Sequence, residues 1–289
     1  MGHIRYEVRD RVATVTIDRP EKRNAMTFAI LREFEEAIRY AGDDDAAGAV
    51  VVTGAGGAFC AGTDLVDLAD TPEDQRSGRA RRVGGVEDAA GVGTPDGAAG
   101  LARDDAGADP QGGGWRAPWP IVTCPKPVIA AVDGPAVGMG AEFATQCDVR
   151  IASTRARFGW IFVLRGLVAD TGAGTFLLPR LVGPAAAMRL LFSGEIVDAA
   201  EALRLGFVTA VVEPDDLPAV ADAEAQRYLD ASPFALRRTK ELVYGGMFRP
   251  MDEHVRETAR LLQECFASDD HREGVAAFLE RRPAVFTGR

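Results

Sequence analysis

Hydrophobic residues follow strand patterns at four places in the first two-thirds of the chain. Ala13, Val15 and Ile17 alternate with threonines, which is typical of a strand with one buried face. Short continuous apolar runs, expected of strands covered on both faces, span residues 50–53, 128–132 and 149–152. Helical spacing begins after Thr27, a candidate N-cap, and continues to Gly42. This alternation of strands and helices predicts a mixed α/β core.

The last third of the chain has a helical pattern throughout. Six segments carry hydrophobic residues at helical spacing: residues 185–192, 199–205, 217–229, 234–243, 253–266 and 272–280. Asp198 with Glu201 three residues later resembles a capping box. We therefore expect a core over residues 1–195 and a helical C-terminal region over residues 196–289.

One stretch of the core, residues 70–118, departs from both patterns. Residues 71–118 hold 11 of the 32 glycines, and such a composition does not easily offset the entropy lost on ordering. A surface insertion is one interpretation. The other is a lid or pocket wall, since long loops in compact domains are often functional. Trp115 and Trp119 slightly favour the second interpretation.

Charge and composition narrow the function classes. The 43 acidic and 33 basic residues give a net charge of -10, which argues against broad binding to nucleic acid. No apolar run approaches the roughly 18 residues that span a membrane, and the charged N-terminus lacks a signal-peptide core. Four cysteines without a C-x-x-C pair predict free thiols in a reducing cytoplasm. Three histidines show no metal-ligand spacing, so neither a zinc site nor a mechanism with a histidine base is expected.

Two glycine-containing turns follow buried strands and are candidates for chemistry. The first, residues 53–65, fails as a nucleotide site because Phe59 occupies the last glycine position of G-x-G-x-x-G. The second, residues 133–142, opens a helix whose first N–H groups lack intrahelical acceptors. An N–H near Met139 can therefore meet a developing oxyanion beside Glu142. The alternative is that Glu142 is only a favourable acidic residue in the first turn of a helix.

These segments together resemble the crotonase superfamily, the enoyl-CoA hydratase/isomerase family. The similarity follows the family's order over nearly the whole chain, with residues 70–118 unmatched. The matching segments are residues 19–26, 50–65, 126–142 with 147–152, 156–159, 178–183 and 273–283.

The resemblance implies a spiral of ββα units followed by a helical trimerisation region, assembled as a homotrimer or a hexamer. It implies acyl-CoA thioester substrates, with coenzyme A as part of the substrate and no separate cofactor. It also implies two backbone N–H groups that stabilise a thioester enolate, at positions corresponding to Thr63 and Met139. Such preorganised donors typically contribute several kcal/mol to catalysis.

Hydratases of this family use two carboxylates, and here the resemblance is incomplete. The first corresponds to Glu142, whereas the second position holds Phe162, which cannot move a proton. Asp170 lies where dienoyl-CoA isomerases of the superfamily place a catalytic aspartate. Asp170 is then either the second acid/base or an N-cap for a helix beginning near Thr171.

The resemblance also assigns substrate-binding positions. Those expected near the acyl-CoA are Ala25, Ala61, Gly62, Asp64, Leu65, Gly138, Trp160 and Phe162, the aromatic ones being equally consistent with plain core. Lys22, Arg23 and Arg281 match positions that approach CoA phosphates, and Arg281 often serves a neighbouring subunit. Cys60 has no histidine placed to activate it, so we interpret it as structural.

The sequence therefore predicts an enzyme of enoyl-CoA hydratase or enoyl-CoA isomerase type. A dienoyl-CoA isomerase-like enzyme that uses Glu142 and Asp170 is the first alternative. A non-catalytic acyl-CoA-binding scaffold that has lost its second carboxylate is another. A nucleic-acid-binding member of the superfamily is disfavoured by the net charge and by the lack of a lysine-rich helix.

Overall fold

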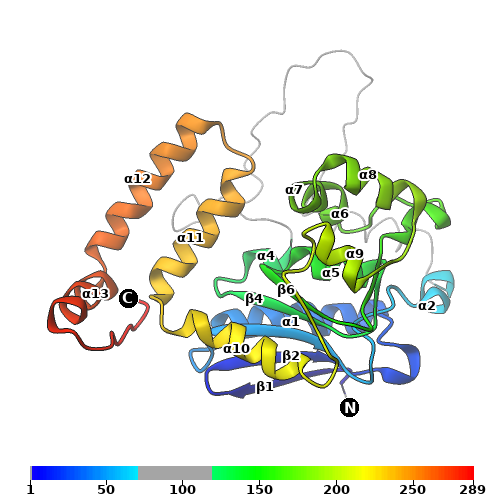
Figure 1. Cartoon of the computed structure of the whole chain (residues 1–289), viewed down its shortest axis with the longest axis horizontal. Coiled ribbons are helices and arrows are strands. Elements are labelled where there is room, and N and C mark those ends of the chain that lie inside the picture. The colour runs from blue at the N-terminus through cyan, green and yellow to red at the C-terminus, as the bar shows by residue number, and fades with distance from the viewer. Residues whose placement is uncertain (1, 71–118) are drawn as a thin grey trace.

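A six-stranded sheet forms the centre of the molecule (Figure 1). The computed structural model describes residues 2–70 and 119–289, so the predicted glycine-rich insertion lies outside the described residues except at its first residue. The strand order is β1-β2-β3-β4-β6-β9, in which only β1 and β2 pair antiparallel. These strands are β1 Ile4–Arg9, β2 Val12–Ile17, β3 Ala49–Gly54, β4 Val128–Val132, β6 Val149–Ser153 and β9 Ala210–Val212.

Alternate side chains of the strands enter two separate hydrophobic clusters, one on each face of the sheet. Val50 and Val52 face the larger cluster, which includes Phe34 of helix α1 (Phe28–Asp43), while Val51 faces the smaller cluster under α10 (Leu217–Leu229). Helix α1 begins where the sequence predicts, because the Thr27 hydroxyl accepts a hydrogen bond from the Ile30 N–H at 3.2 Å. The mixed α/β core is confirmed.

A second, smaller sheet carries the loops that form the candidate site. It contains β5 (Pro135–Val137), β7 (Arg157–Gly159) and β8 (Val197–Asp198) in the order β5-β7-β8. The short helices around it are η1 Pro20–Lys22, α2 Leu65–Asp70, α4 Pro120–Thr123, α5 Met139–Gln146, η2 Ile161–Arg165, α6 Ala173–Phe176, α7 Leu178–Val182, α8 Pro184–Ser193 and α9 Ala199–Arg204. The expected cap of α9 is present, since Asp198 Oδ1 accepts from the Glu201 N–H at 2.8 Å.

Three helices leave the core and form an arm at one end of the molecule (Figure 1). The arm consists of α11 (Pro233–Gly246), α12 (Met251–Ala267) and α13 (Asp269–Glu280). Beyond residue 195, β9 still joins the central sheet and α10 still packs on it. We keep the division into a core and a helical C-terminal region as a proposal, and these contacts favour a boundary between α10 and α11.

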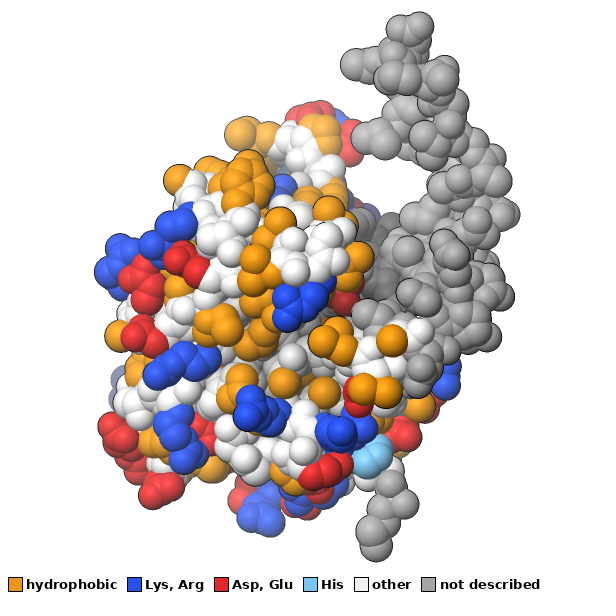
Figure 2. Space-filling model, turned by 90° about the vertical axis from the view of Figure 1, so that its right-hand side faces the viewer, with side chains coloured by type: hydrophobic (Ala, Val, Ile, Leu, Met, Phe, Trp, Pro, Cys, Tyr) orange, Lys and Arg blue, Asp and Glu red, His pale blue; other side chains and the backbone are white. Residues whose placement is uncertain are grey.

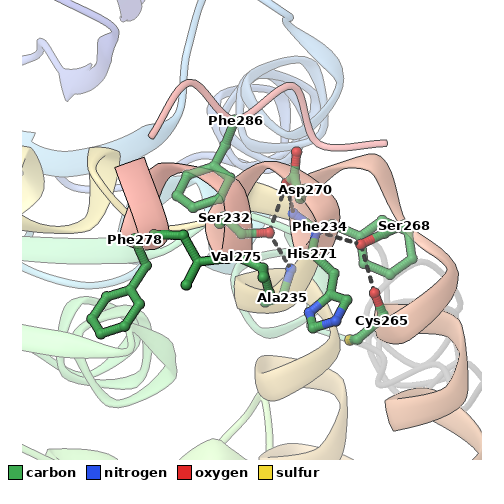
Figure 3. Close-up of a pocket in the computed structure, with 12 residues that line it drawn as sticks. Ser232, Phe234, Ala235, Cys265, Ser268, Asp270, His271, Val275, Phe278 and Phe286 are labelled. Atoms are coloured by element: carbon green, nitrogen blue, oxygen red, sulfur yellow. Dashed lines mark hydrogen bonds between the residues drawn. The ribbon is translucent and has the colours of Figure 1, made fainter. Parts of the chain in front are cut away.

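The arm carries an open apolar pocket of about 520 Å³ (Figure 3). Phe234, Val275, Phe278 and Phe286 contribute hydrophobic lining. Asp270 closes one side, because its carboxylate accepts hydrogen bonds from the Ser232 hydroxyl and from the amides of residues 287 and 288. In the part of the chain that the structure describes, no helix combines the length and the apolar character needed to cross a membrane.

Candidate active site

Two turns that are far apart in sequence lie against each other at the site. The segment after β3 pairs with β5, since the Val137 N–H donates to the Cys60 carbonyl at 3.0 Å. Helix α5 then begins so close to this segment that a Cβ on Gly140 would stand 2.1 Å from the Cys60 oxygen. A Cβ on Gly62 would stand 3.7 Å from the Met139 nitrogen. The structure thus brings both predicted turns together.

The backbone of Thr63 is oriented by its neighbours. Met26 donates to the Gly62 carbonyl and accepts from the Asp64 N–H, both at 2.8 Å. Because peptide groups alternate along an extended segment, the Thr63 N–H faces away from Met26. No described residue accepts a hydrogen bond from it. Met139 is the first residue of α5, where N–H groups have no acceptor inside the helix.

Asn24 fixes the loop that carries Thr63, and sequence reasoning gave it no such role. It is fully buried at a φ of 59°, and its Nδ2 donates to the carbonyls of Ala55 and Ala58 at 2.9 and 2.6 Å. Arg19 links the same loop to Asp64 through a 2.9 Å ion pair. These contacts join segments more than 30 residues apart, so they can be seen in the three-dimensional structure but not in the sequence.

Glu142 is fully buried in the first turn of α5. Its Oε2 accepts from the Thr171 hydroxyl at 2.5 Å and from the Gly174 N–H at 3.1 Å. Its Oε1 has no hydrogen-bond partner among the described residues. Burial raises the pKa of Glu142 to about 7, and the charge of Asp170 acts in the same direction against the two hydrogen bonds. The carboxyl group is therefore poised to gain or lose a proton near neutral pH.

Asp170 belongs to the same site. It is partly buried, and its charge contributes to raising the pKa of both Glu142 and Cys60, in each case behind the larger effect of burial. The N-cap interpretation of Asp170 is wrong. Helix α6 begins at Ala173 with Gly172 at the cap position, and the Ala173 N–H donates to Thr171 instead.

Two aromatic residues line the site from the β7–η2 segment. Phe162 is buried, with its Cζ 4.0 Å from where a Cβ on Gly138 would stand. Trp160 is buried as well and packs edge-on against Phe207, its ring centroid 5.1 Å away. Trp160 Cδ1 and Glu142 Oε1 both lie within 2.8 Å of the position that a Cβ on Gly174 would take. Phe162 thus gives an apolar wall where a second carboxylate was expected from the family pattern.

The remaining predicted substrate-binding residues differ in position. Lys22, Arg23 and Leu65 are exposed, and Ala25 and Ala61 are partly buried. Figure 2 shows the side of the molecule that carries α2 and α8, where hydrophobic side chains gather around a hollow with Lys and Arg at its border. Arg281 is not brought to this site within one chain, because it ends α13 on the arm at the opposite end of the molecule (Figure 1).

Cysteine and metal chemistry receive no support from the described residues. Burial raises the pKa of the Cys60 thiol to about 12, which keeps it protonated and unreactive. Cys124 and Cys147 are also buried, and Cys265 on α12 is partly exposed. Within residues 2–70 and 119–289, no group of three or more His, Cys, Asp or Glu side chains is placed to hold a metal ion.

Comparison with known proteins gives one consistent result. The family model for enoyl-CoA hydratase/isomerase matches residues 7–83 and 102–289. A probable enoyl-CoA hydratase of Rhodobacter capsulatus is 36% identical over 99% of this chain and 98% of its own length. Crotonyl-CoA hydratase of Syntrophomonas wolfei is 33% identical over 99% of this chain and 98% of its own.

Solved structures agree with the sequence matches. The enoyl-CoA hydratase of Bacillus anthracis superposes with a TM-score of 0.82 at 26% identity, covering 99% of this chain and all of that one. The fold is that of an α/β protein of the crotonase class with C-terminal helices. This chain belongs to the enoyl-CoA hydratase/isomerase family and is an enoyl-CoA hydratase-type enzyme.

Proposed function

We propose that this enzyme adds water to, or moves, the double bond of an enoyl-CoA thioester. The observation that carries the proposal is the buried Glu142 carboxyl, one turn after Met139 and beside the loop of Thr63. The relatives that share the family pattern over their whole length have hydratase names. Both reactions pass charge onto the thioester oxygen, so one set of groups serves either.

In this proposal, the N–H groups of Thr63 and Met139 bind the thioester oxygen. The Met26 contacts turn the Thr63 N–H outward, and Met139 supplies the first N–H of a helix, where the dipole favours negative charge. Donors fixed before the reaction stabilise the enolate without reorganising. Because both donors are backbone groups, the unusual side chains at these positions do not interfere.

Glu142 is the group proposed to transfer protons at the acyl carbons. Its pKa of about 7 lets it accept a proton as a carboxylate and return it as an acid at the same pH. Asp170 is proposed as its partner, since its charge acts on Glu142 across the site. A partner at this position takes the place of the carboxylate that Phe162 replaces.

The apolar wall at Phe162 favours double-bond migration as the second candidate function. Isomerisation needs a base that carries a proton between two carbons but no ordered water, so a phenyl ring there is compatible with it. Hydration needs Asp170 or Glu142 to orient water instead. Hydration and isomerisation therefore give different products, which an assay can distinguish.

Binding of the CoA moiety is assigned to three positively charged residues, Lys22, Arg23 and Arg281. Lys22 is the last residue of the short helix η1 and Arg23 is its C-cap, and both are exposed to solvent. Arg281 is far from the site of its own chain, so it is proposed to serve a neighbouring subunit of a homotrimer or a dimer of trimers. The exposed hydrophobic residues of the arm supply surface for that assembly.

The test compares crotonyl-CoA with a 3-enoyl-CoA and follows the absorbance of the conjugated enoyl thioester. Glu142→Gln and Asp170→Asn are measured beside the wild type, with Glu36→Gln on the exposed face of α1 as the control. We expect Glu142→Gln to lower turnover at least 100-fold, in line with the usual contribution of a positioned acid/base group. The control is expected to keep full activity.

The outcomes separate the candidates. Loss of hydration in both variants would establish the Glu142–Asp170 pair in a hydratase. Isomerisation without hydration would assign the pair to proton transfer between carbons. Tight binding of both thioesters with no turnover would contradict the proposal and favour a non-catalytic acyl-CoA-binding scaffold.

A further inference from the structure

We propose that Thr171 is a positioning residue that gives the two oxygens of Glu142 different tasks. Oε2 is a fixed hydrogen-bond acceptor, and Oε1 carries the transferred proton. The inference rests on the proposed role of Glu142 and adds the residue and the atom through which that role is performed. The contacts of Thr171, Gly174 and Trp119 carry the argument.

The direction of the Thr171 hydrogen bond follows from a count of donors. A hydroxyl has one O–H to donate and two lone pairs to accept with. Its oxygen already accepts from the Ala173 N–H at 3.2 Å and from Gln146 Nε2 at 3.4 Å. The O–H is therefore directed at Glu142 Oε2, 2.5 Å away. Both amide donors hold the hydroxyl in this orientation.

The same count fixes which oxygen of Glu142 carries the proton. Oε2 receives the Thr171 O–H and the Gly174 N–H, and an amide N–H cannot act as an acceptor. A proton on Oε2 would face two donors with no acceptor in reach. The neutral acid therefore holds its proton on Oε1, the oxygen without a partner among the described residues.

Oε1 is buried, and its position depends on the absence of a side chain at residue 174. A Cβ on residue 174 would stand 2.3 Å from Oε1, so only glycine leaves the carboxyl group in this position. The buried Trp160 ring lies on the same side, with its Nε1 also lacking a partner among the described residues. Gly174 thus supplies one N–H to Oε2 and places no side chain against Oε1.

The backbone of Thr171 is held independently of its side chain. The buried Trp119 donates from Nε1 to the Thr171 carbonyl at 2.7 Å. The Gly172 N–H donates to the Ala169 carbonyl at 3.2 Å and closes the turn. Removing only the hydroxyl should therefore change the hydrogen bonds of Glu142 without moving the segment.

The experiment measures kcat, KM and their pH dependence in Thr171→Val and Thr171→Ser. Valine matches threonine in shape but lacks the hydroxyl, and serine keeps the hydroxyl but lacks the methyl group. Thr175→Val on α6 is the matched control, since its exposed hydroxyl donates to the Gly172 carbonyl and to no other described residue. Thermal unfolding of each variant reports on the fold.

For Thr171→Val, we expect kcat to fall roughly 10- to 100-fold, the range of a lost hydrogen bond to a charged group, with KM changed less than about twofold. The apparent pKa in the kcat profile should rise, because a hydrogen bond to the ionised form holds a carboxyl pKa down. Thr171→Ser should retain both the rate and the profile.

Two results would overturn the inference. One is Thr171→Val with the kcat and pH profile of the wild type, and the other is Thr171→Ser as impaired as Thr171→Val. Full activity of Glu142→Gln would instead overturn the proposed function, so the two failures are distinguishable.

Discussion

At the scale of single residues, the catalytic role proposed for Glu142 opposes stability. A carboxyl with no exposed surface cannot be hydrated when it ionises, and its two hydrogen bonds replace that hydration only in part. Its folded-state pKa of about 7 lies above the ordinary value of 4.5, so the folded protein holds this proton more tightly than the unfolded chain. The contribution of Glu142 to stability is thus complete below pH 4.5 and is lost as pH rises through about 7.

We therefore expect Glu142→Gln to stabilise the protein at pH 8 while lowering turnover at least 100-fold. A neutral amide has no ionised form to bury, and the gain is on the order of 1–3 kcal/mol. At pH 4.5 the two proteins should differ little. Urea denaturation at the two pH values measures the difference, and an equal gain at both would contradict the assignment to ionisation.

Sequence reasoning reached the charged residues of the site but not the residues that hold them. Glu142 and Asp170 could be predicted from the turn at the start of a helix and from the family pattern. Thr171, Gly174 and Asn24 could not, because their roles depend on contacts with segments distant in sequence. Whether Asp170 is an acid/base group or an N-cap also could not be decided from the sequence, because the answer depends on the residue at which α6 begins.

At the scale of elements, the spacing between α5 and the segment after β3 is fixed by Gly140. Its missing Cβ allows the Cys60 carbonyl to lie where a side chain would otherwise stand. The same approach sets the separation of the Thr63 and Met139 amides, since each lies within three residues of this contact. A small change in the distance between Gly140 and Cys60 would therefore move both proposed donors, the N–H groups of Thr63 and Met139.

Gly140→Ala should therefore lower kcat at least 10-fold, because a methyl group 2.1 Å from a carbonyl oxygen must push the two segments apart. Gly274→Ala on α13 is the matched control, since its Cβ would meet Phe286 at an ordinary 3.4 Å. Steady-state kinetics and crotonyl-CoA binding are measured on both. Unchanged kcat in Gly140→Ala would show that the proposed donors do not depend on this contact.

The length of a strand largely decided whether the sequence could predict it, although the six-residue β1, which is mostly exposed, was not predicted. The strands β2, β3, β4 and β6 and the long helices have enough periodic positions to define their bounds closely. The strands β5, β7, β8 and β9 have only two or three residues each, too few for a period. They form because parallel or antiparallel partners are already in place beside them.

At the scale of the whole molecule, the arm exposes more hydrophobic surface than an isolated chain usually does. Met251 and Phe278 are 82% and 83% exposed, and Val255 is 60% exposed. Such patches typically mark association with another protein surface. This exposure supports the proposed assembly, which would also bring Arg281 to a neighbouring site.

We expect sedimentation velocity to show an assembly about three or six times the 30.7 kDa chain mass. The double variant Met251→Lys with Phe278→Asp should sediment as a smaller species, because charges oppose burial of the arm. Phe192→Asp, on the 69% exposed Phe192 of α8, serves as the control and should keep the full assembly. A monomeric wild type would contradict the proposed assembly.

The four thiols differ in burial, so a thiol reagent should reach one cysteine of the native protein. Cys60, Cys124 and Cys147 are buried, and burial raises the pKa of each. Cys265, on α12 of the arm, is the one with partial exposure. A maleimide dye should therefore label the native enzyme at a single position, distant from Glu142. Fluorescence from that dye would follow arm contacts during turnover without any cysteine having to be removed.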